Sequence, residues 1–296
     1  MMYELIQLGQ RSYYINSPVK VGVYRNNETE VCLIDSGNDK EAGKKILKIL
    51  ESNDWKLGCI INTHSNADHI GGNNYLQQHT GCTIFSSGIE VAFSKFPILE
   101  PSFLYGGYPC KDLRHKFLLA AESNVIDLTS ENFPRDLHVI PLPGHFFHMV
   151  GIRTPDDVVF LADSVNSEMI LEKYQISFIY DVSKYLETLS MIKTIQAEIF
   201  VPAHAEVTRD IRPLAELNYK KIMEISEKIL EICRQPLCFE DILQKIFAAY
   251  QLTMTFEQYV LVGSTVRSYL SWLKDEGKLN VQFKENRLLW QAKSGS

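Results

Sequence analysis

The decisive stretch of this chain is Asn62-Thr63-His64-Ser65-Asn66-Ala67-Asp68-His69-Ile70-Gly71-Gly72. It follows an apolar strand expected at 57–62 and contains three strong ligand residues within six positions. Imidazole nitrogens and carboxylate oxygens are the ligands that zinc and related divalent ions bind. Alternation at the strand end points His64 and Asn66 in the same direction, whereas Asp68 and His69 lie beyond the turn and can face a second position. Alone, the signal is moderate, because a histidine-rich strand end can be structural.

Acidic or imidazole side chains also lie at the ends of other expected strands. They are Asp35 on the strand 31–36, His145 after 137–142, Asp163 after 157–162 and His204 after 198–202. In α/β folds, reactive residues gather at strand ends. A single histidine of this kind is usually a core residue, but an ordered series is hard to explain by structure alone.

Strands and helices alternate over the first 210 residues, which predicts an α/β body. An apolar face at helical spacing supports a helix at 40–52. The other expected elements of this part are strands at 13–25 and 82–86 and a helix at about 70–79.

Residues 93–130 interrupt this alternation with several prolines, glycines and aromatic residues. Two interpretations are open: a satellite hydrophobic cluster, or a lid over a substrate pocket. As a lid, the segment would offer Tyr105 and Tyr108, one of which would hold an oxyanion. Arg114 and His115 belong to a basic run that is typical of a solvated surface and less so of an anion site.

The pattern changes near residue 211, which divides the chain into expected domains 1–210 and 211–296. Three amphipathic helices followed by a two-stranded hairpin are the order of a winged-helix module, a small α+β domain. The expected third helix carries few cations besides Arg267 and Lys274. Protein packing or dimerisation is therefore favoured over DNA readout, and a homodimer remains open.

Composition and charge exclude several classes of protein. The 296 residues are 45% hydrophobic and 22% charged, as in ordinary globular proteins. The net charge of the chain is −6. Residues 211–296 hold 12 Lys+Arg against 10 Asp+Glu, a net +2, so residues 1–210 carry −8. This negative charge disfavours a nucleic-acid substrate. No apolar run is long enough to span a membrane, and the N-terminus lacks the pattern of a secretory signal. We expect a cytoplasmic protein whose six cysteines are reduced.

These motifs together resemble the metallo-β-lactamase-fold hydrolase superfamily. The resemblance is carried by Asp35, His64-x-Asn66-x-Asp68-His69, Gly144-His145, Asp163 and His204. The motif set is specific for the fold and poorly specific for the substrate. It implies a four-layer αββα sandwich over residues 1–210, with metals at one edge between the sheets. The winged-helix-like tail is similar to that of some members.

The resemblance also implies a role for each residue. One metal site would use His64, the residue at 66 and His145. The other would use Asp68, His69 and His204, with Asp163 bridging the two. Asp35 would accept a hydrogen bond from a ligand imidazole and fix its orientation.

Asn66 departs from the family pattern, which usually has histidine there. An amide oxygen is a poorer zinc ligand than imidazole, so this site should be weak, altered or empty unless something compensates. His148 is one candidate, as a ligand or as a residue behind the ligands. Alternatively, Asn66 would hydrogen-bond a water or the substrate.

The resemblance implies a metal-dependent hydrolase with one or two divalent ions per chain, zinc first and iron or manganese as alternatives. A metal-activated water would attack an ester, thioester, lactone or related small acyl substrate, with Asp68 orienting it. The rival interpretations are a metal-dependent nuclease or phosphodiesterase acting on single-stranded nucleic acid, and a degenerate member that binds metal or ligand without catalysis.

Overall fold

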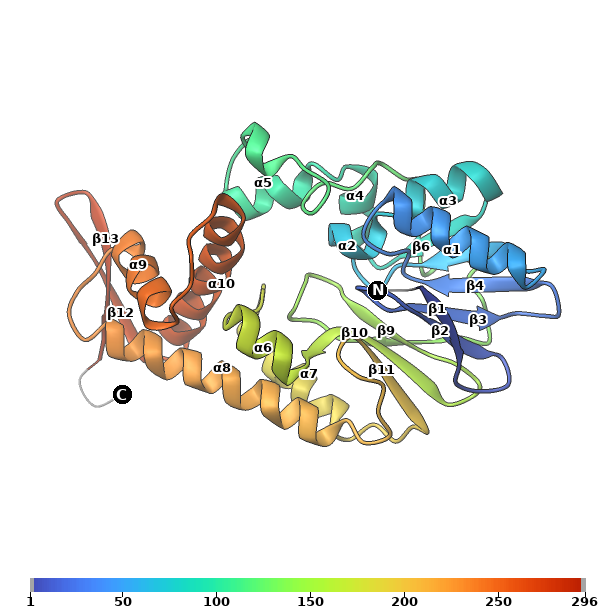
Figure 1. Ribbon diagram of the computed structural model, residues 1–296. Helices are drawn as coiled ribbons and strands as arrows, with labels where there is room; N and C mark the ends of the chain where they lie inside the picture. The colour runs from blue at the N-terminus through green and yellow to red at the C-terminus, as the bar shows by residue number, and fades with distance from the viewer. Residues whose placement is uncertain (1–2, 294–296) are drawn as a thin grey trace.

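The computed structural model describes residues 3–293. Residues 1–2 and 294–296, at the ends of the two expected domains, lie outside the described residues. Two sheets pack face to face, and helices cover the outer face of each (Figure 1). This is the expected four-layer αββα sandwich.

The first sheet has seven strands whose spatial order follows the chain. Its first four strands pair antiparallel and the remaining ones parallel. The expected strand at 13–25 is two strands, because the segment between them contains Pro18, which has no backbone N–H to donate to a ladder. The strands are β1 (Glu4–Gln7), β2 (Ser12–Asn16), β3 (Val21–Arg25), β4 (Glu30–Ile34), β5 (Lys56–Ile61), β6 (Thr83–Ser86) and β7 (Val125–Asp127).

The second sheet has the strand order β11-β10-β9-β8. Its strands are β8 (His138–Pro141), β9 (Val150–Arg153), β10 (Val158–Asn166) and β11 (Ile199–His204). β10 continues beyond the expected end at 162. The register with β11 shifts around Ala162, whose φ is +49°, and this bulge carries the chain through Asp163.

Three helices cover the first sheet: α1 (Lys40–Ser52), α3 (Asn73–Thr80) and, over β6 and β7, α4 (Glu90–Lys95). α1 has the expected bounds, and the Asp39 side chain caps it by accepting the Ala42 N–H. The helix expected at 70–79 is instead α2 (Ala67–Ile70) followed by α3. The chain turns between them at Gly71, where a Cβ would lie 2.3 Å from the Asn38 backbone.

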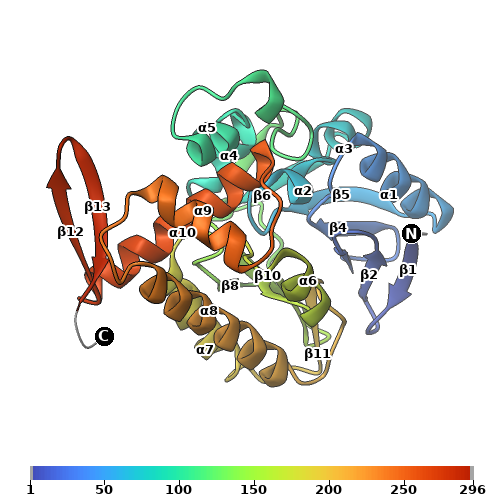
Figure 2. The ribbon, with the colours of Figure 1, turned by 60° about the vertical axis from the view of Figure 1, so that its left-hand side comes forward.

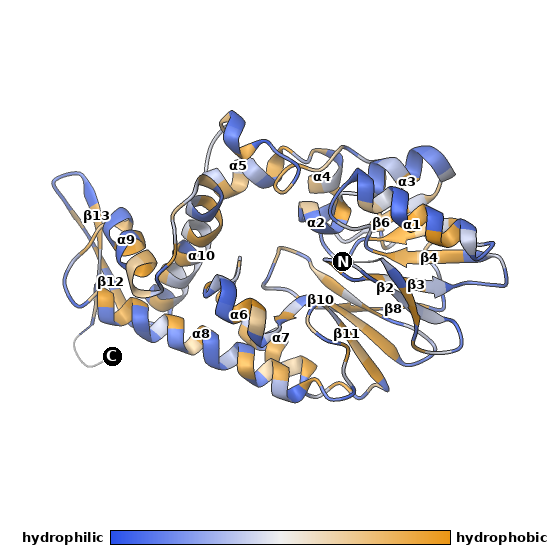
Figure 3. Ribbon diagram, in the orientation of Figure 1, coloured by the Kyte–Doolittle hydropathy of each residue, from blue (hydrophilic) through white to orange (hydrophobic). Residues whose placement is uncertain are grey.

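Two helices lie against β10 of the second sheet, α7 (Val182–Ile192) and α8 (Arg212–Ile232). Apolar residues fill all three interfaces of the sandwich, and the strands are accordingly hydrophobic in Figure 3. Leu33 packs beneath α1, Phe160 lies between the sheets, and Leu161 faces the helices of the second sheet. This alternation fixes which face of each strand is buried.

The segment 93–130 contains a satellite hydrophobic cluster, as the first of the two alternatives expects, and the lid stays a prediction. It includes α5 (Leu99–Tyr105) and the 3₁₀ helix η1 (Lys111–Leu113), preceded by α4 (Glu90–Lys95). Its buried leucines, Leu104, Leu113 and Leu118, surround Val260 of the C-terminal part.

The C-terminal part has the expected order of three helices and a hairpin. After α8 come α9 (Phe239–Ala249), α10 (Phe256–Asp275), β12 (Leu279–Lys284) and β13 (Arg287–Ala292). The hairpin stands at one end of the molecule (Figure 2). One hydrophobic cluster joins α8, α9 and α10 to the helix face of the second sheet. Within residues 3–293, no helix combines the length and apolar character that crossing a bilayer requires.

Candidate metal centre

The motif residues meet at one edge of the sandwich, between the two sheets. His64 follows β5, and Asp68 and His69 lie on α2. His145 follows β8, while Asp163 and His204 lie on β10 and β11. The Ser36 N–H donates to the His69 carbonyl at 2.8 Å and ties the end of β4 to α2.

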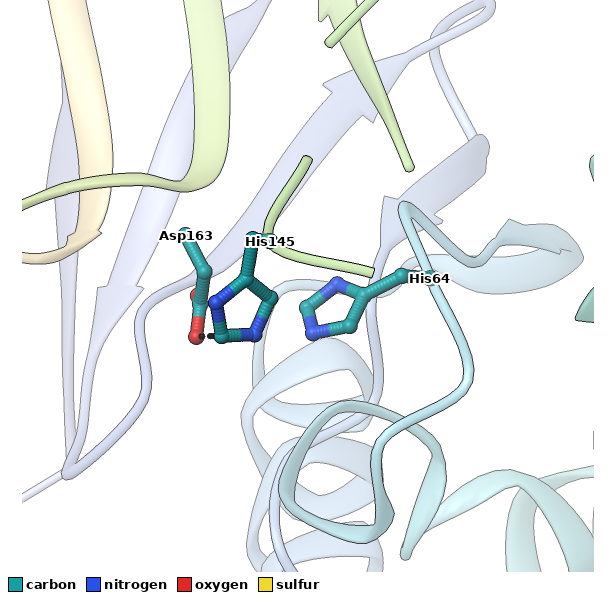
Figure 4. A group of neighbouring side chains, drawn as sticks. All are labelled: His64, His145 and Asp163. Atoms are coloured by element: carbon teal, nitrogen blue, oxygen red, sulfur yellow. Dashed lines mark ion pairs between the residues drawn. The ribbon is translucent and has the colours of Figure 1, made fainter. Parts of the chain in front are cut away.

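The side chains form two groups, each with its ligand atoms within 4.8 Å of one another. The first group is His64, His145 and Asp163, shown in Figure 4, where both imidazoles and the carboxylate point toward a common centre. The second group is Asp68, His69 and His204. These are the two ligand sets that the resemblance implied. Asn66, whose side chain is neither charged nor an imidazole, belongs to neither group.

Asp163 lies between the two groups. Its Oδ2 is 3.5 Å from Nε2 of His145 in the first group and 3.3 Å from Nε2 of His204 in the second. Its Oδ1 is 3.0 Å from Nε2 of His69. One carboxylate therefore faces imidazoles of both groups, the position that a bridging ligand requires.

Three histidines turn Nδ1 outward to an acceptor and Nε2 inward. His69 Nδ1 donates to Asp35 Oδ2 at 2.8 Å, and His145 Nδ1 donates to the Phe178 carbonyl at 3.0 Å. The Thr63 hydroxyl donates its hydrogen to Asp35. The oxygen of the same hydroxyl therefore accepts a hydrogen bond from His64 Nδ1 at 3.1 Å. In the neutral rings of His64 and His145 the inward Nε2 therefore carries a lone pair, whereas Nε2 of His69 faces Asp163 Oδ1 at 3.0 Å.

Burial and charge shift the pKa values of the cluster's members in opposite directions. Burial, reinforced by His69, holds the pKa of His64 well below its usual value, and burial also lowers the pKa of His145. Burial opposes protonation of His204 too, but the Asp163 carboxylate outweighs it and raises the pKa to about 10. The first group thus keeps neutral imidazoles, while the second holds protons that a metal would displace.

The residues present fit divalent metal ions. His64 Nε2 is fully buried and has no hydrogen-bond partner among residues 3–293. In the first group, the inward lone pairs of His64 and His145 and the Asp163 carboxylate repel one another unless a cation lies between them. Two atoms bonded to one ion at ~2.1 Å lie roughly 3.0–3.4 Å apart, and the ion-pair separations in the cluster run from 3.0 to 3.9 Å.

Two buried carboxylates near the ligand loop were missed by sequence reasoning. Glu90 of α4 accepts hydrogen bonds from the Ser65 backbone and hydroxyl and from the His148 N–H at 2.7 Å. Glu100 of α5 accepts the Asn66 side-chain amide at 2.8 Å. Burial raises the pKa of both, to about 7 for Glu90. Neither follows a strand, so no motif marked them.

Other candidate residues lie outside both groups. His148 is exposed and its ring lies against Gly88, so it does not replace the missing imidazole. Among the described contacts, Tyr105 packs on Phe256, Arg114 bonds the Tyr108 hydroxyl, and His115 pairs with Glu257 at 2.9 Å. These contacts join the insertion to α10 or to itself.

Two curated relatives are hydroxyacylglutathione hydrolases. The protein of Methylococcus capsulatus is 37% identical over 62 residues, 18% of this chain and 24% of that protein. The Haemophilus influenzae protein is 25% identical over 139 residues, 47% of this chain and 62% of that protein. The matched part is thus less than two thirds of either relative.

Solved structures share the fold across nearly the whole chain. A β-lactamase domain protein from Burkholderia ambifaria superposes with a TM-score of 0.72 at 14% identity, covering 98% of this chain and 94% of that one. A metallo-β-lactamase family protein from Thermus thermophilus gives 0.68 at 14% identity, covering 99% and 98%. A family model described as the metallo-beta-lactamase superfamily matches residues 15–204. This chain therefore belongs to the metallo-β-lactamase superfamily.

Proposed function

We propose that this protein is a metal-dependent hydrolase of a small acyl substrate, with a thioester as the first choice. The observation that carries the proposal is the convergence of buried Nε2 lone pairs and the Asp163 carboxylate at one edge of the sandwich. The hydroxyacylglutathione hydrolases to which parts of the chain are similar act, by their name, on a glutathione thioester.

The first group would hold one ion through His64, His145 and Asp163, and the second another through Asp68, His69, His204 and the shared Asp163. Zinc is the first choice, because imidazole and carboxylate together suit it. When bound, such ions lower the pKa of a water toward ~7 and polarise an acyl oxygen.

Asp68 is the group best placed to handle the proton of that water. Its side chain is 38% exposed, whereas that of Asp163 is 9% exposed. Burial works against ionisation, but His69 and His204 outweigh it and lower the pKa of Asp68 to about 2. The ionised carboxylate accepts a hydrogen bond from the attacking water and passes its proton to the leaving group. Water adds to the acyl carbon, the carbon–sulfur bond breaks, and an acid and a thiol leave.

The test is hydrolysis of a panel of small thioesters, esters and lactones by zinc-loaded protein. D68N should lower kcat at least ~100-fold, while D54N, the same change at an exposed residue, leaves it unchanged. A single-stranded oligonucleotide completes the panel and should not be cleaved, given the −8 charge of residues 1–210. Equal activity of D68N and wild type, or cleavage of the oligonucleotide alone, would overturn the proposal.

A further inference from the structure

Asn66 is held by a carboxylate that comes from the insertion. Glu100 on α5 is 4% exposed, and both of its oxygens contact the ligand loop. Oε1 accepts Nδ2–H of Asn66 at 2.8 Å, and Oε2 accepts the Ala67 N–H at 3.1 Å. A buried carboxylate with both oxygens directed at two successive residues fixes the position of that loop.

This contact decides which way the Asn66 amide faces. Both oxygens of Glu100 act as acceptors in this arrangement, and the oxygen that faces Asn66 accepts from the amide nitrogen. The amide oxygen is then turned the other way, and it lies 3.2 Å from Nε2 of His145.

No hydrogen bond joins the Asn66 amide oxygen and His145 Nε2, because both atoms are acceptors. His145 places its Nδ1–H on the Phe178 carbonyl, so its Nε2 carries a lone pair. Two acceptors facing each other at 3.2 Å repel. A cation bonded to both removes the repulsion, and the spacing suits neighbouring ligands at ~2.1 Å from one ion.

We infer that Glu100 is a positioning residue that turns the Asn66 amide oxygen into the first group, where it takes the place of the usual imidazole as a metal ligand. This deepens the proposed function and rests on it for the presence of metal. The first group then offers two nitrogens and two oxygens, from His64, His145, Asp163 and Asn66. Oxygen ligands suit manganese better than imidazoles do, so the first group should prefer zinc over manganese less strongly than the same group would with the usual histidine at position 66.

The inference also gives the insertion a task other than that of a lid. Glu90 of α4 holds Ser65, and Glu100 of α5 holds the next two residues. The two helices therefore support the segment that carries His64 and Asn66. The leucine cluster around Val260 anchors α5 to α10 and keeps Glu100 in place.

The test is E100Q, which keeps the size of the side chain. The Ala67 N–H needs an acceptor, so the amide oxygen of the introduced glutamine would face it and the amide nitrogen would face Asn66. That arrangement turns the Asn66 nitrogen toward the metal group. Wild type should hold two ions per chain, and E100Q should lose affinity at the first group by about 10–100-fold. Elemental analysis after dialysis, and titration with Zn²⁺ and Mn²⁺ against a chelator, measure this.

N66H is the matched control. An imidazole at 66 offers a nitrogen to the metal whichever side chain stands at 100, so E100Q should have little effect in the N66H background. Retention of one ion, and equal melting curves of the chelated wild type and the chelated E100Q, show that E100Q is folded. Equal ion counts and affinities in wild type and E100Q, or a single ion in wild type, would overturn the inference.

The same proteins separate this inference from the proposed function. Two ions in wild type and one in E100Q, with no substrate hydrolysed, would uphold the role of Glu100 and overturn the proposed function. Equal ion counts in wild type and E100Q, together with metal-dependent hydrolysis, would uphold the proposed function and overturn the role of Glu100.

Discussion

Asp35 accepts a hydrogen bond from Nδ1 of His69 at 2.8 Å, although the two residues are 34 positions apart. The same carboxylate accepts the Thr63 N–H and the Thr63 hydroxyl, both at 2.8 Å. Asp35 reaches these donors from a left-handed backbone, with φ at +65°, a conformation that Asp and Asn tolerate best among non-glycine residues. One carboxylate thus orients a ligand imidazole and fixes the residue before His64.

Replacing Asp35 by asparagine should weaken metal binding by the second group. The amide keeps the left-handed backbone but cannot accept from all three donors, so His69 loses its fixed orientation. We expect a 10–100-fold lower affinity for Zn²⁺, measured by chelator competition. Unchanged affinity in a folded D35N protein would show that the contact does not support the metal site.

Metal binding should release protons. Without metal, Asp163 outweighs the effect of burial and raises the pKa of His69 and His204, the latter to about 10, so both are protonated at pH 7. A nitrogen bonded to metal carries no proton, so binding displaces about two protons and affinity rises with pH until about pH 10. Calorimetry in buffers of different ionisation enthalpy measures the release. Binding heats that are independent of buffer would contradict it.

Glu90 should make stability fall as pH rises. Burial raises its pKa to about 7 from a reference value of 4.5, so the folded state binds more protons than the unfolded state between these values. The free energy of unfolding should therefore decrease over that interval, by at most ~1.4 kcal/mol per pH unit from this group. Denaturant titrations of wild type and E90Q at pH 5 and pH 8 isolate the effect. An identical difference between the two proteins at both pH values would refute it.

Gly144 should not tolerate alanine. Its φ is +122°, and a Cβ there would lie 2.2 Å from the backbone nitrogen of Tyr185 at the start of α7. Both the backbone and α7 would have to move, which also shifts the adjacent His145, so we expect a loss of more than ~2 kcal/mol. The control is G81A, where φ is +71° but nothing lies within 4 Å. It should cost only ~1–2 kcal/mol. Similar melting temperatures of the two variants would contradict the argument.

The α/β body and the ligand residues were predictable because they depend on local patterns, whereas the four-layer sandwich and the division of the ligands into two groups came from the resemblance to a known family. Strand ends carry the ligands, and parallel strands such as β4 and β5 bring their carboxyl ends to one edge. The helix at 40–52 was predictable to the residue because its cap and apolar face are adjacent in sequence. Where tertiary contacts decide, prediction failed: the break at Gly71 depends on the Asn38 backbone, and the bulge at Ala162 on pairing with β11.

The residues around the ligands were less accessible to sequence reasoning. Glu100 has no strand before it and no partner at a regular spacing, and its role emerges only from a contact with Asn66 across 34 residues. His148 follows His145 closely in sequence, which made it a candidate, but the turn directs its ring toward Gly88. Proximity along the chain does not fix side-chain direction in such a turn.

The most direct test of the account is hydrolysis of a small thioester before and after metal removal, with ions per chain counted on the same samples. The account predicts that chelation abolishes hydrolysis and that Zn²⁺ restores it in proportion to the ions bound. The D163N protein should bind fewer ions per chain than wild type and should not regain hydrolysis when Zn²⁺ is added. Undiminished hydrolysis by protein shown to contain no metal would contradict it.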